Sequence, residues 1–143
     1  MAPNLDKPEG QGLPPTLLSP ILEGILEELR AIRDALAKTE MRMVGGSLLI
    51  VYESSWEKVK EALDRSQQEA LEANVEDDVN GDDEDSDDDE TSLPFAVKLI
   101  DFAHTKIVPG EGPDQGVLKG IDTTISLLEG RIKEVESDHE ARR

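Results

Sequence analysis

Ser47-Leu48-Leu49-Ile50-Val51-Tyr52 and Phe95-Ala96-Val97-Lys98-Leu99-Ile100-Asp101-Phe102 are the stretches that decide the fold of this 143-residue chain. Both are short and rich in β-branched or aromatic residues, and the first follows the glycine pair Gly45-Gly46. This composition predicts two strands, and the nearly continuous apolar run of the first predicts that it is buried. Alternate side chains of a strand point to opposite faces, and both faces of the second stretch are largely apolar, so we expect burial on both sides.

Three amphipathic stretches surround these strands and predict helices. The first runs from Thr16 to beyond Leu36 with apolar residues at steps of three and four, and Ser19-Pro20 is its expected start. The second runs from Trp56 to about Ala73, and the third from about Gly116 to Val135. The predicted fold is α+β, with short, paired antiparallel strands covered by helices.

The remaining segments are polar or charged and predict little ordered structure. Residues 1–15 carry four prolines and predict a flexible arm, and the charged tail 137–143 is expected to fray. The domain proper is expected over 16–136. It is interrupted at 74–92 by an insert whose core, Glu76 to Glu90, holds eleven acidic side chains and no basic one. Like charges repel, so we expect this insert to be disordered, and a docking tract for a basic protein is the alternative.

The composition excludes several classes of function. The formal net charge is −18 at pH 7, which rules out binding nucleic acid by neutralising phosphates. Because the chain has no cysteine, it has no disulfide, thiolate metal site or catalytic thiol. The longest strongly apolar run, Leu48 to Tyr52, is far too short for a membrane helix, so we expect no membrane span.

Asp101 is the residue whose chemistry stands out. It ends an apolar strand, where a carboxylate costs free energy unless it is paired or bound to a metal. It either accepts backbone donors to cap the following loop, or it binds Mg²⁺, which prefers one or two carboxylates together with phosphate oxygens. Protein kinases use an aspartate followed by phenylalanine for the second purpose, and Phe102 follows Asp101 here.

A family resemblance rests on this region. The string Val97-Lys98-Leu99-Ile100-Asp101-Phe102-Ala103-His104-Thr105, followed by Gly112-Pro113-Asp114-Gln115-Gly116 and Gly120-Ile121-Asp122, resembles the C-terminal part of the inositol polyphosphate kinases, in particular the fungal inositol polyphosphate multikinases. Upstream, Gly46-Ser47-Leu48-Leu49-Ile50-Val51-Tyr52-Glu53 is similar to that family's Ser-Ser-Leu-Leu segment. The resemblance covers roughly residues 13–135, apart from the acidic insert.

The resemblance implies the C-terminal lobe of a kinase-like, ATP-grasping fold. It implies ATP-dependent phosphorylation of inositol polyphosphates in inositol phosphate biosynthesis, in the nucleus, the cytoplasm or both. Asp101 would bind the catalytic Mg²⁺, Ser47 would lie beside the metal and the phosphates of ATP, and His104 is a candidate contact to the inositol phosphate. On the residues alone, the Ser47 hydroxyl could instead be satisfied within its strand and His104 could hydrogen-bond to the backbone.

The departures from the family pattern limit these expectations. The family's Pro-x-x-x-Asp-x-Lys-x-Gly motif, which supplies the acid/base aspartate, is absent from these 143 residues, so no catalytic residue is assigned. Gly46 also replaces the first serine of the Ser-Ser-Leu-Leu segment. We therefore expect a truncated kinase portion that is inactive alone. A non-catalytic protein that binds a basic partner through Glu76 to Glu90 is the rival hypothesis, and a poorly folded remnant is the third. The accepted inositol phosphate, the hydroxyl phosphorylated and the oligomeric state stay open.

Overall fold

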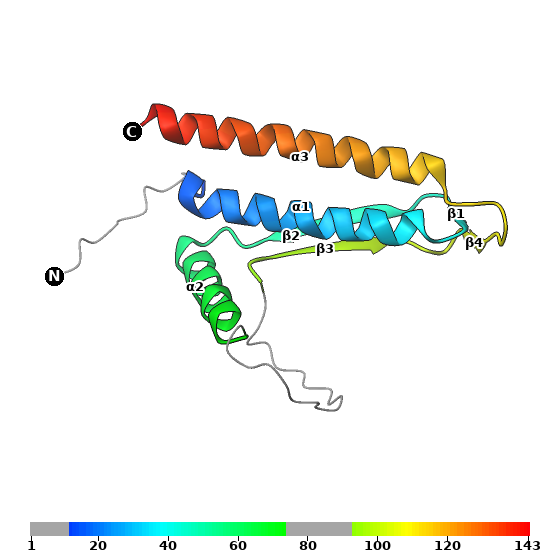
Figure 1. Ribbon diagram of the computed structural model, residues 1–143, viewed down its shortest axis with the longest axis horizontal. Helices are drawn as coiled ribbons and strands as arrows, with labels where there is room; N and C mark the ends of the chain where they lie inside the picture. Colours follow the sequence, from blue (N-terminus) through cyan, green and yellow to red (C-terminus); the bar gives the residue numbers. More distant parts are fainter. Residues whose placement is uncertain (1–11, 74–92) are drawn as a thin grey trace.

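The computed structural model describes residues 12–73 and 93–143, and Figure 1 shows how their helices and strands are arranged. The helices are α1 (Pro15–Ala37), α2 (Trp56–Ala73) and α3 (Gln115–Ala141). The strands are β1 (Met41–Met43), β2 (Ser47–Tyr52), β3 (Phe95–Ile100) and β4 (Thr105–Ile107). The α+β class predicted from the sequence is confirmed, and β2 and α2 begin and end where the sequence patterns place them.

The described strands form two antiparallel pairs. β2 pairs with β3 from Ser47 opposite Ile100 to Tyr52 opposite Phe95, which confirms the expected pairing. β1 pairs with β4, and Arg42 lies opposite Lys106 at the centre of that pair. The second pair was not predicted, because three-residue strands with a charged residue in the middle carry no recognisable periodicity.

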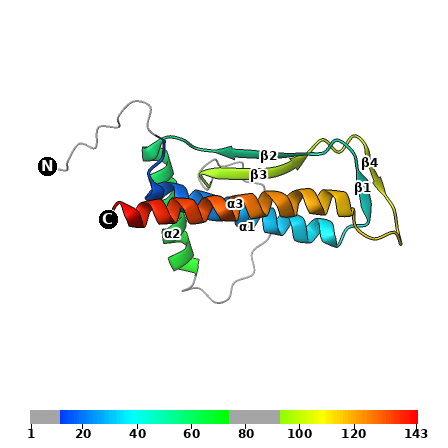
Figure 2. The same ribbon diagram turned by 90° about the horizontal axis from the view of Figure 1, so that it is seen from above.

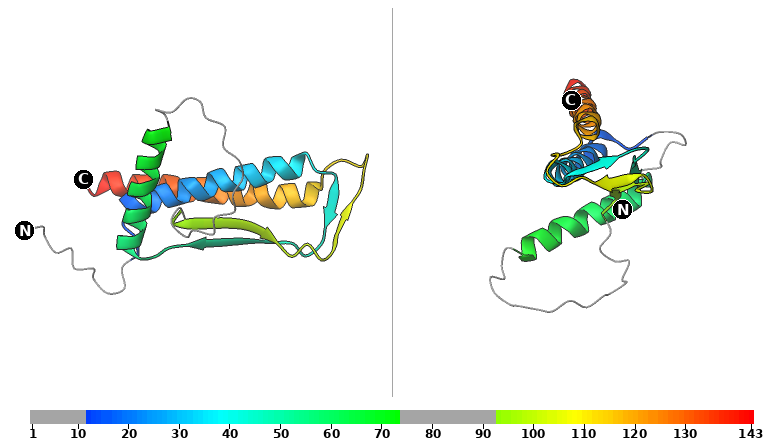
Figure 3. Two further views of the ribbon diagram at one scale, coloured as in Figure 1. Left: turned by 90° about the horizontal axis from the view of Figure 1, so that it is seen from below. Right: turned by 90° about the vertical axis from the view of Figure 1, so that its right-hand side faces the viewer.

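Helix α1 lies at the centre of the layers. α1 and α3 run antiparallel along the molecule with β2 and β3 beside them (Figure 2), and α2 crosses this long axis at one end (Figure 3). One core cluster joins Ile21, Ile25 and Leu29 of α1 to Val59 of α2 and Val97 of β3. Burying an aliphatic side chain of this size contributes about 1.5–3 kcal/mol, so this cluster holds α2 and β3 on α1.

A second core cluster closes the other end of the bundle. Leu36 near the end of α1 packs with Met41 and Met43 of β1 and with Leu118 and Ile121 of α3. The α1 and α3 surfaces are also joined by two exposed ion pairs, Arg30–Glu129 and Arg33–Asp122, both at 2.7 Å. Exposed ion pairs contribute little, so apolar burial is the main attachment between these helices.

Helix α1 begins earlier than the sequence predicted. Ser19-Pro20 is not its start, because the helix begins at Pro15 with Pro14 as the N-cap residue and contains Pro20. Leu13 and Leu17 pack against the first core cluster, and their burial extends the helix by a turn despite the interior proline. The flexible arm predicted over residues 1–15 is therefore wrong for Pro15, which belongs to the helix. Residues 1–11 of that arm lie outside the described part of the chain.

The expected burial of the strands is also wrong in part. In β2 only Leu48 is half-buried and the other residues are exposed, and in β3 only Val97 is fully buried. The reason is the position of α1, which contacts β3 and leaves β2 at an open edge. The helices therefore cover one strand of this pair rather than both.

The C-terminal segment is more ordered than expected. The predicted fraying of residues 137–143 is wrong as far as Ala141, because α3 continues to that residue and buries Ile132 and Val135 in the turns before it. The predicted disorder of the acidic insert 74–92 concerns residues outside the described part. No helix within residues 12–73 and 93–143 combines the length and apolar composition needed to cross a bilayer.

A glycine sets how closely α1 approaches β3. The ring of Phe95 occupies the position where a Cβ atom on Gly24 would lie. Gly130 in α3 has no heavy atom within 4 Å of the corresponding position, so it provides a control in a comparable helical setting.

We expect Gly24→Ala to destabilise the fold in denaturant unfolding. Alanine gains about 0.5–1 kcal/mol of helix propensity, but displacing the packed Phe95 ring costs about 1–3 kcal/mol. Gly130→Ala gains the helix propensity of alanine without displacing any side chain, so it should stabilise the protein. If both variants were stabilised equally, the close packing of Phe95 on α1 would be refuted.

Candidate functional site

The β2–β3 register brings two of the candidate site residues to one end of the sheet. Ser47 begins β2 and lies opposite Ile100, the last residue of β3, and Asp101 follows directly. Both Ser47 and Asp101 are exposed. The structure therefore places a hydroxyl and a carboxylate at neighbouring strand ends, where both are accessible to a ligand.

Asp101 turns the chain out of β3 through an unusual backbone conformation. Its φ of 67° is the only positive φ of a non-glycine among the described residues. Aspartate tolerates this left-handed region better than most residues do, because its short polar side chain can hydrogen-bond locally. The turn continues with the Thr105 N–H donating to the Phe102 oxygen at 3.1 Å and leads into β4. Strained backbone at an exposed carboxylate is typical of functional sites.

His104 lies in this turn but is not brought into contact with Ser47 or Asp101 by any interaction in the structure. It is exposed, and its backbone oxygen accepts from the Val44 N–H at 3.2 Å. This bond holds the turn against the segment between β1 and β2. The three candidate residues therefore share one end of the molecule, and their individual roles stay predictions.

Gly46 has a packing role that the sequence did not reveal. A Cβ atom at Gly46 would collide with the side chain of Met43, which is buried in the second core cluster. A serine at this position would therefore require Met43 to repack. The departure from the family's first serine is coupled to the core that supports the site.

Charged side chains hold the loop between β4 and α3. The Glu40 carboxylate accepts from the Gly110 N–H at 2.6 Å and from the Gly112 N–H at 3.3 Å. The Arg42 guanidinium donates to the Gly112 oxygen at 2.8 Å and to the Glu111 oxygen at 3.0 Å. Gly110 and Gly112 have φ values of 81° and 73°, a conformation that glycine adopts without strain. Glu40, which directly precedes β1, and Arg42 of β1 therefore fix this loop through acceptors and donors respectively.

Asp114 joins the same loop to α3. It is the N-cap of α3, and its Oδ1 accepts from the N–H groups of Gly116 at 3.0 Å and Val117 at 3.2 Å. Its Oδ2 accepts from the Met43 N–H at 3.0 Å. These backbone donors, Met43 foremost, hold the pKa of Asp114 below its usual value because they stabilise the charged carboxylate.

The sequence analysis did not identify Glu40, Arg42 and Asp114 as the residues that hold the loop between β4 and α3. An aspartate directly before a helix is a recognised N-cap signal, and it would have placed the start of α3 correctly at Gln115. No comparable signal marks Glu40 or Arg42, because their partners lie about seventy residues away in the chain.

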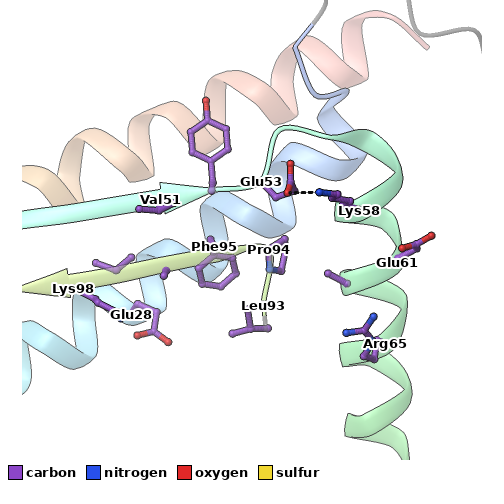
Figure 4. Close-up of a pocket in the computed structure, with 14 residues that line it drawn as sticks. Glu28, Val51, Glu53, Lys58, Glu61, Arg65, Leu93, Pro94, Phe95 and Lys98 are labelled. Atoms are coloured by element: carbon purple, nitrogen blue, oxygen red, sulfur yellow. Dashed lines mark ion pairs between the residues drawn. The ribbon is translucent and has the colours of Figure 1, made fainter. Parts of the chain in front are cut away.

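Two hollows lie near the strand pair. A small one of about 310 Å³ is lined by Ser47, the glycines before it, Met43 and the first turns of α3. A larger groove of about 830 Å³ lies at the other end of the strands, between the end of β2, the start of β3 and α2. Figure 4 shows Glu53 and Lys58 meeting at its rim, at 4.0 Å. None of Ser47, Asp101 and His104 lines the larger groove.

The two oxygen donors at this end of the sheet, the Ser47 hydroxyl and the Asp101 carboxylate, have the chemistry that hard divalent cations prefer. Hard divalent cations take oxygen ligands, and Mg²⁺ is commonly bound by one or two carboxylates together with substrate phosphates. Over residues 12–73 and 93–143 there is no group of three or more His, Cys, Asp and Glu side chains that could hold a metal. The Asp101 carboxylate and the Ser47 hydroxyl therefore suit a cation that arrives with phosphate oxygens, and they do not form a complete metal site.

Comparisons with known proteins agree on one family. The family model of inositol polyphosphate kinase matches residues 16–129. The inositol polyphosphate multikinase of Saccharomyces cerevisiae is 31% identical over 120 residues, covering 72% of this chain and 33% of that protein. The crystal structure of the S. cerevisiae inositol phosphate multikinase Ipk2 in complex with ADP and Mn²⁺ matches with a TM-score of 0.56 and 27% identity, over 87% of this chain and 42% of that one. The chain thus spans about a third of the length of the curated relative.

We expect Asp114→Ala to lose about 0.5–2 kcal/mol of stability at neutral pH, because it removes a helix cap. Since the folded-state pKa of Asp114 is lowered, its contribution is present above the ordinary aspartate pKa of about 3.9 and is lost as the pH falls through the folded value. The difference in the free energy of unfolding between Asp114→Ala and the unmodified chain, measured in urea, should therefore shrink between about pH 7 and about pH 3. Asp114→Asn keeps an oxygen acceptor and should lose less. A difference independent of pH would contradict this assignment.

Proposed function

Because this chain belongs to the inositol polyphosphate kinase family, we propose that it forms the part of such a kinase that holds the divalent cation and the nucleotide phosphates. The proposed reaction is transfer of the terminal phosphoryl group of ATP to a hydroxyl of an inositol polyphosphate. The observation that carries the proposal is the register that brings Ser47 and Asp101 to the same end of the β2–β3 pair. The matched crystal structure with ADP and Mn²⁺ supports a nucleotide and a divalent cation as ligands.

Each candidate residue has a role suited to its chemistry. The Asp101 carboxylate would bind the cation, which we propose to be Mg²⁺, and the Ser47 hydroxyl would contact the cation or a phosphate oxygen. When bound, such a cation would neutralise the negative charge of the phosphate oxygens during the transfer. The Glu40 and Asp114 contacts would keep the adjoining loop from moving as these ligands bind. His104 is the proposed contact to the inositol phosphate.

The charge of the chain indicates that this part is not sufficient for the reaction. ATP and inositol polyphosphates are both strongly anionic, so a competent site needs clustered lysine and arginine side chains. This chain carries 15 basic against 33 acidic residues and lacks the family's Asp-x-Lys motif. We therefore propose that the chain alone has negligible kinase activity.

The alternative function gains no support from the comparisons. A protein that binds a basic partner through Glu76 to Glu90 would use residues outside the described part of the chain. The location in the nucleus or the cytoplasm stays a prediction.

We expect Mg²⁺ and ADP together to shift the backbone amide signals of Ser47 and Asp101 in NMR spectra. Replacing Mg²⁺ with paramagnetic Mn²⁺ should broaden the same signals. Asp101→Asn should abolish both effects while keeping the fold, because asparagine also tolerates the left-handed conformation. Asp138→Asn, at the far end of α3, has the same change of charge and should leave both effects intact. Broadening that leaves Ser47 and Asp101 unaffected would contradict the proposal.

We expect the purified chain to convert no measurable inositol trisphosphate to higher phosphates with Mg²⁺ and ATP. The reason is that this chain has too few lysine and arginine side chains to hold two polyanionic substrates. The assay follows product by anion-exchange chromatography. Conversion that is lost in Asp101→Asn would show that the chain is a complete kinase.

A further inference from the structure

The candidate site lies at a bend between the two antiparallel strand pairs. The first linker, residues 44–46, joins β1 to β2, and the second linker, residues 101–104, joins β3 to β4. Figure 2 shows β1 and β4 turned across the direction of β2 and β3. The Val44 N–H donates to the His104 oxygen at 3.2 Å. The bend is therefore formed by two linkers that are tied to each other.

This bend orients two of the candidate residues, but the linkers do little to fix it. Ser47 directly follows the first linker and Asp101 begins the second, so the angle of the bend sets how the two residues face each other. Gly45 in the first linker has a φ of 74°, and no heavy atom lies within 4 Å of the position of a Cβ atom there. Glycine has more conformational freedom than other residues, so the bend needs support from outside the linkers.

Asp114 supplies such support through Met43. Its Oδ2 accepts from the Met43 N–H at 3.0 Å, at the end of β1 where the first linker begins. The Met43 side chain is buried, and its sulfur occupies the space that a Cβ atom on Gly46 would need. Met43 thus adjoins the first linker at its start along the chain and packs against its last residue. The contact with Asp114 therefore reaches the residue directly before Ser47.

Asp114 uses separate oxygens to hold Met43 and to cap α3. Oδ1 accepts from the N–H groups of Gly116 and Val117, and Oδ2 accepts from Met43. The lowered pKa of Asp114 keeps this carboxyl charged at neutral pH, so both oxygens act as acceptors. An asparagine side chain has one oxygen acceptor, and its nitrogen only donates. A single substitution can therefore separate the helix cap from the contact with Met43.

We propose that Asp114 is a positioning residue for the candidate cation site. By holding Met43, it fixes the bend that sets the direction of the Asp101 carboxylate relative to Ser47. This inference rests on the function proposed above for the identity of the ligand, and it deepens that function by assigning a support to the site. Residues that orient metal ligands without touching the metal typically change metal affinity by about 10–100-fold when they are replaced.

The first test is Asp114→Asn in the full chain, studied by NMR without ligand. Its single side-chain oxygen should stay with the two donors of α3, so the first turn of that helix keeps its protection from amide exchange. The Met43 amide should exchange roughly tenfold faster or more. The amide signals of Ser47 and Asp101 should shift or broaden, because the bend is no longer held. Unchanged signals of these two residues, together with faster exchange at Met43, overturn the proposal.

Two further variants separate positioning from general effects of charge and capping. Asp122→Asn removes the same charge from α3, where Asp122 pairs with Arg33 at 2.7 Å, and should leave the Ser47 and Asp101 signals unchanged. Asp114→Ser keeps a preferred N-cap residue with one oxygen and should reproduce the effects of Asp114→Asn. Equal shifts in Asp114→Asn and Asp122→Asn overturn the proposal. So do signals in Asp114→Ser that match those of the unmodified chain.

Titration with Mg²⁺ and ADP distinguishes this proposal from the proposed function. Asp114→Asn should weaken the apparent affinity by about tenfold, and Asp122→Asn should not change it. An unmodified chain that does not bind Mg²⁺ and ADP refutes the proposed function, while the spectra without ligand still decide the role of Asp114. Binding that is equally tight in the unmodified chain and in Asp114→Asn supports the proposed function and overturns the positioning role.

Discussion

The burial of α1 between β3 and α3 is the contact on which the rest of the structure depends. Leu29 at its centre is completely buried, and the same helix supplies core residues to both clusters. Because Val97 of β3 and Ile121 of α3 pack on this one helix, their relative positions are set by it. The end of β3, where Asp101 lies, is thereby held at a defined place beside the first turns of α3.

The loop beside the candidate site is held by polar contacts, in addition to the core cluster that contains Met43. The turns around it contain glycines in left-handed conformations and cannot bury much apolar surface, so their backbone groups need partners of another kind. Glu40, Arg42 and Asp114 provide these partners, and each satisfies two or three main-chain groups. The loop between β4 and α3 is therefore held in one arrangement by hydrogen bonds from both of its neighbours in space, β1 and the start of α3.

The net charge of the chain bears directly on the proposed function. The proposed reaction has two polyanionic substrates, yet the chain carries 33 acidic against 15 basic residues.

The sequence by itself determined the elements that depend on local patterns. The apolar run from Ser47 to Tyr52, the stripe from Trp56 to Ala73 and the family strings around Asp101 can each be recognised within a few residues, because periodicity and motif are short-range properties. Only the tertiary structure decided which strand is covered, that β1 pairs with β4, and that Glu40 and Arg42 hold a loop far along the chain. Those features depend on contacts between segments about seventy residues apart, and the order of residues in one segment does not reveal its partner in another.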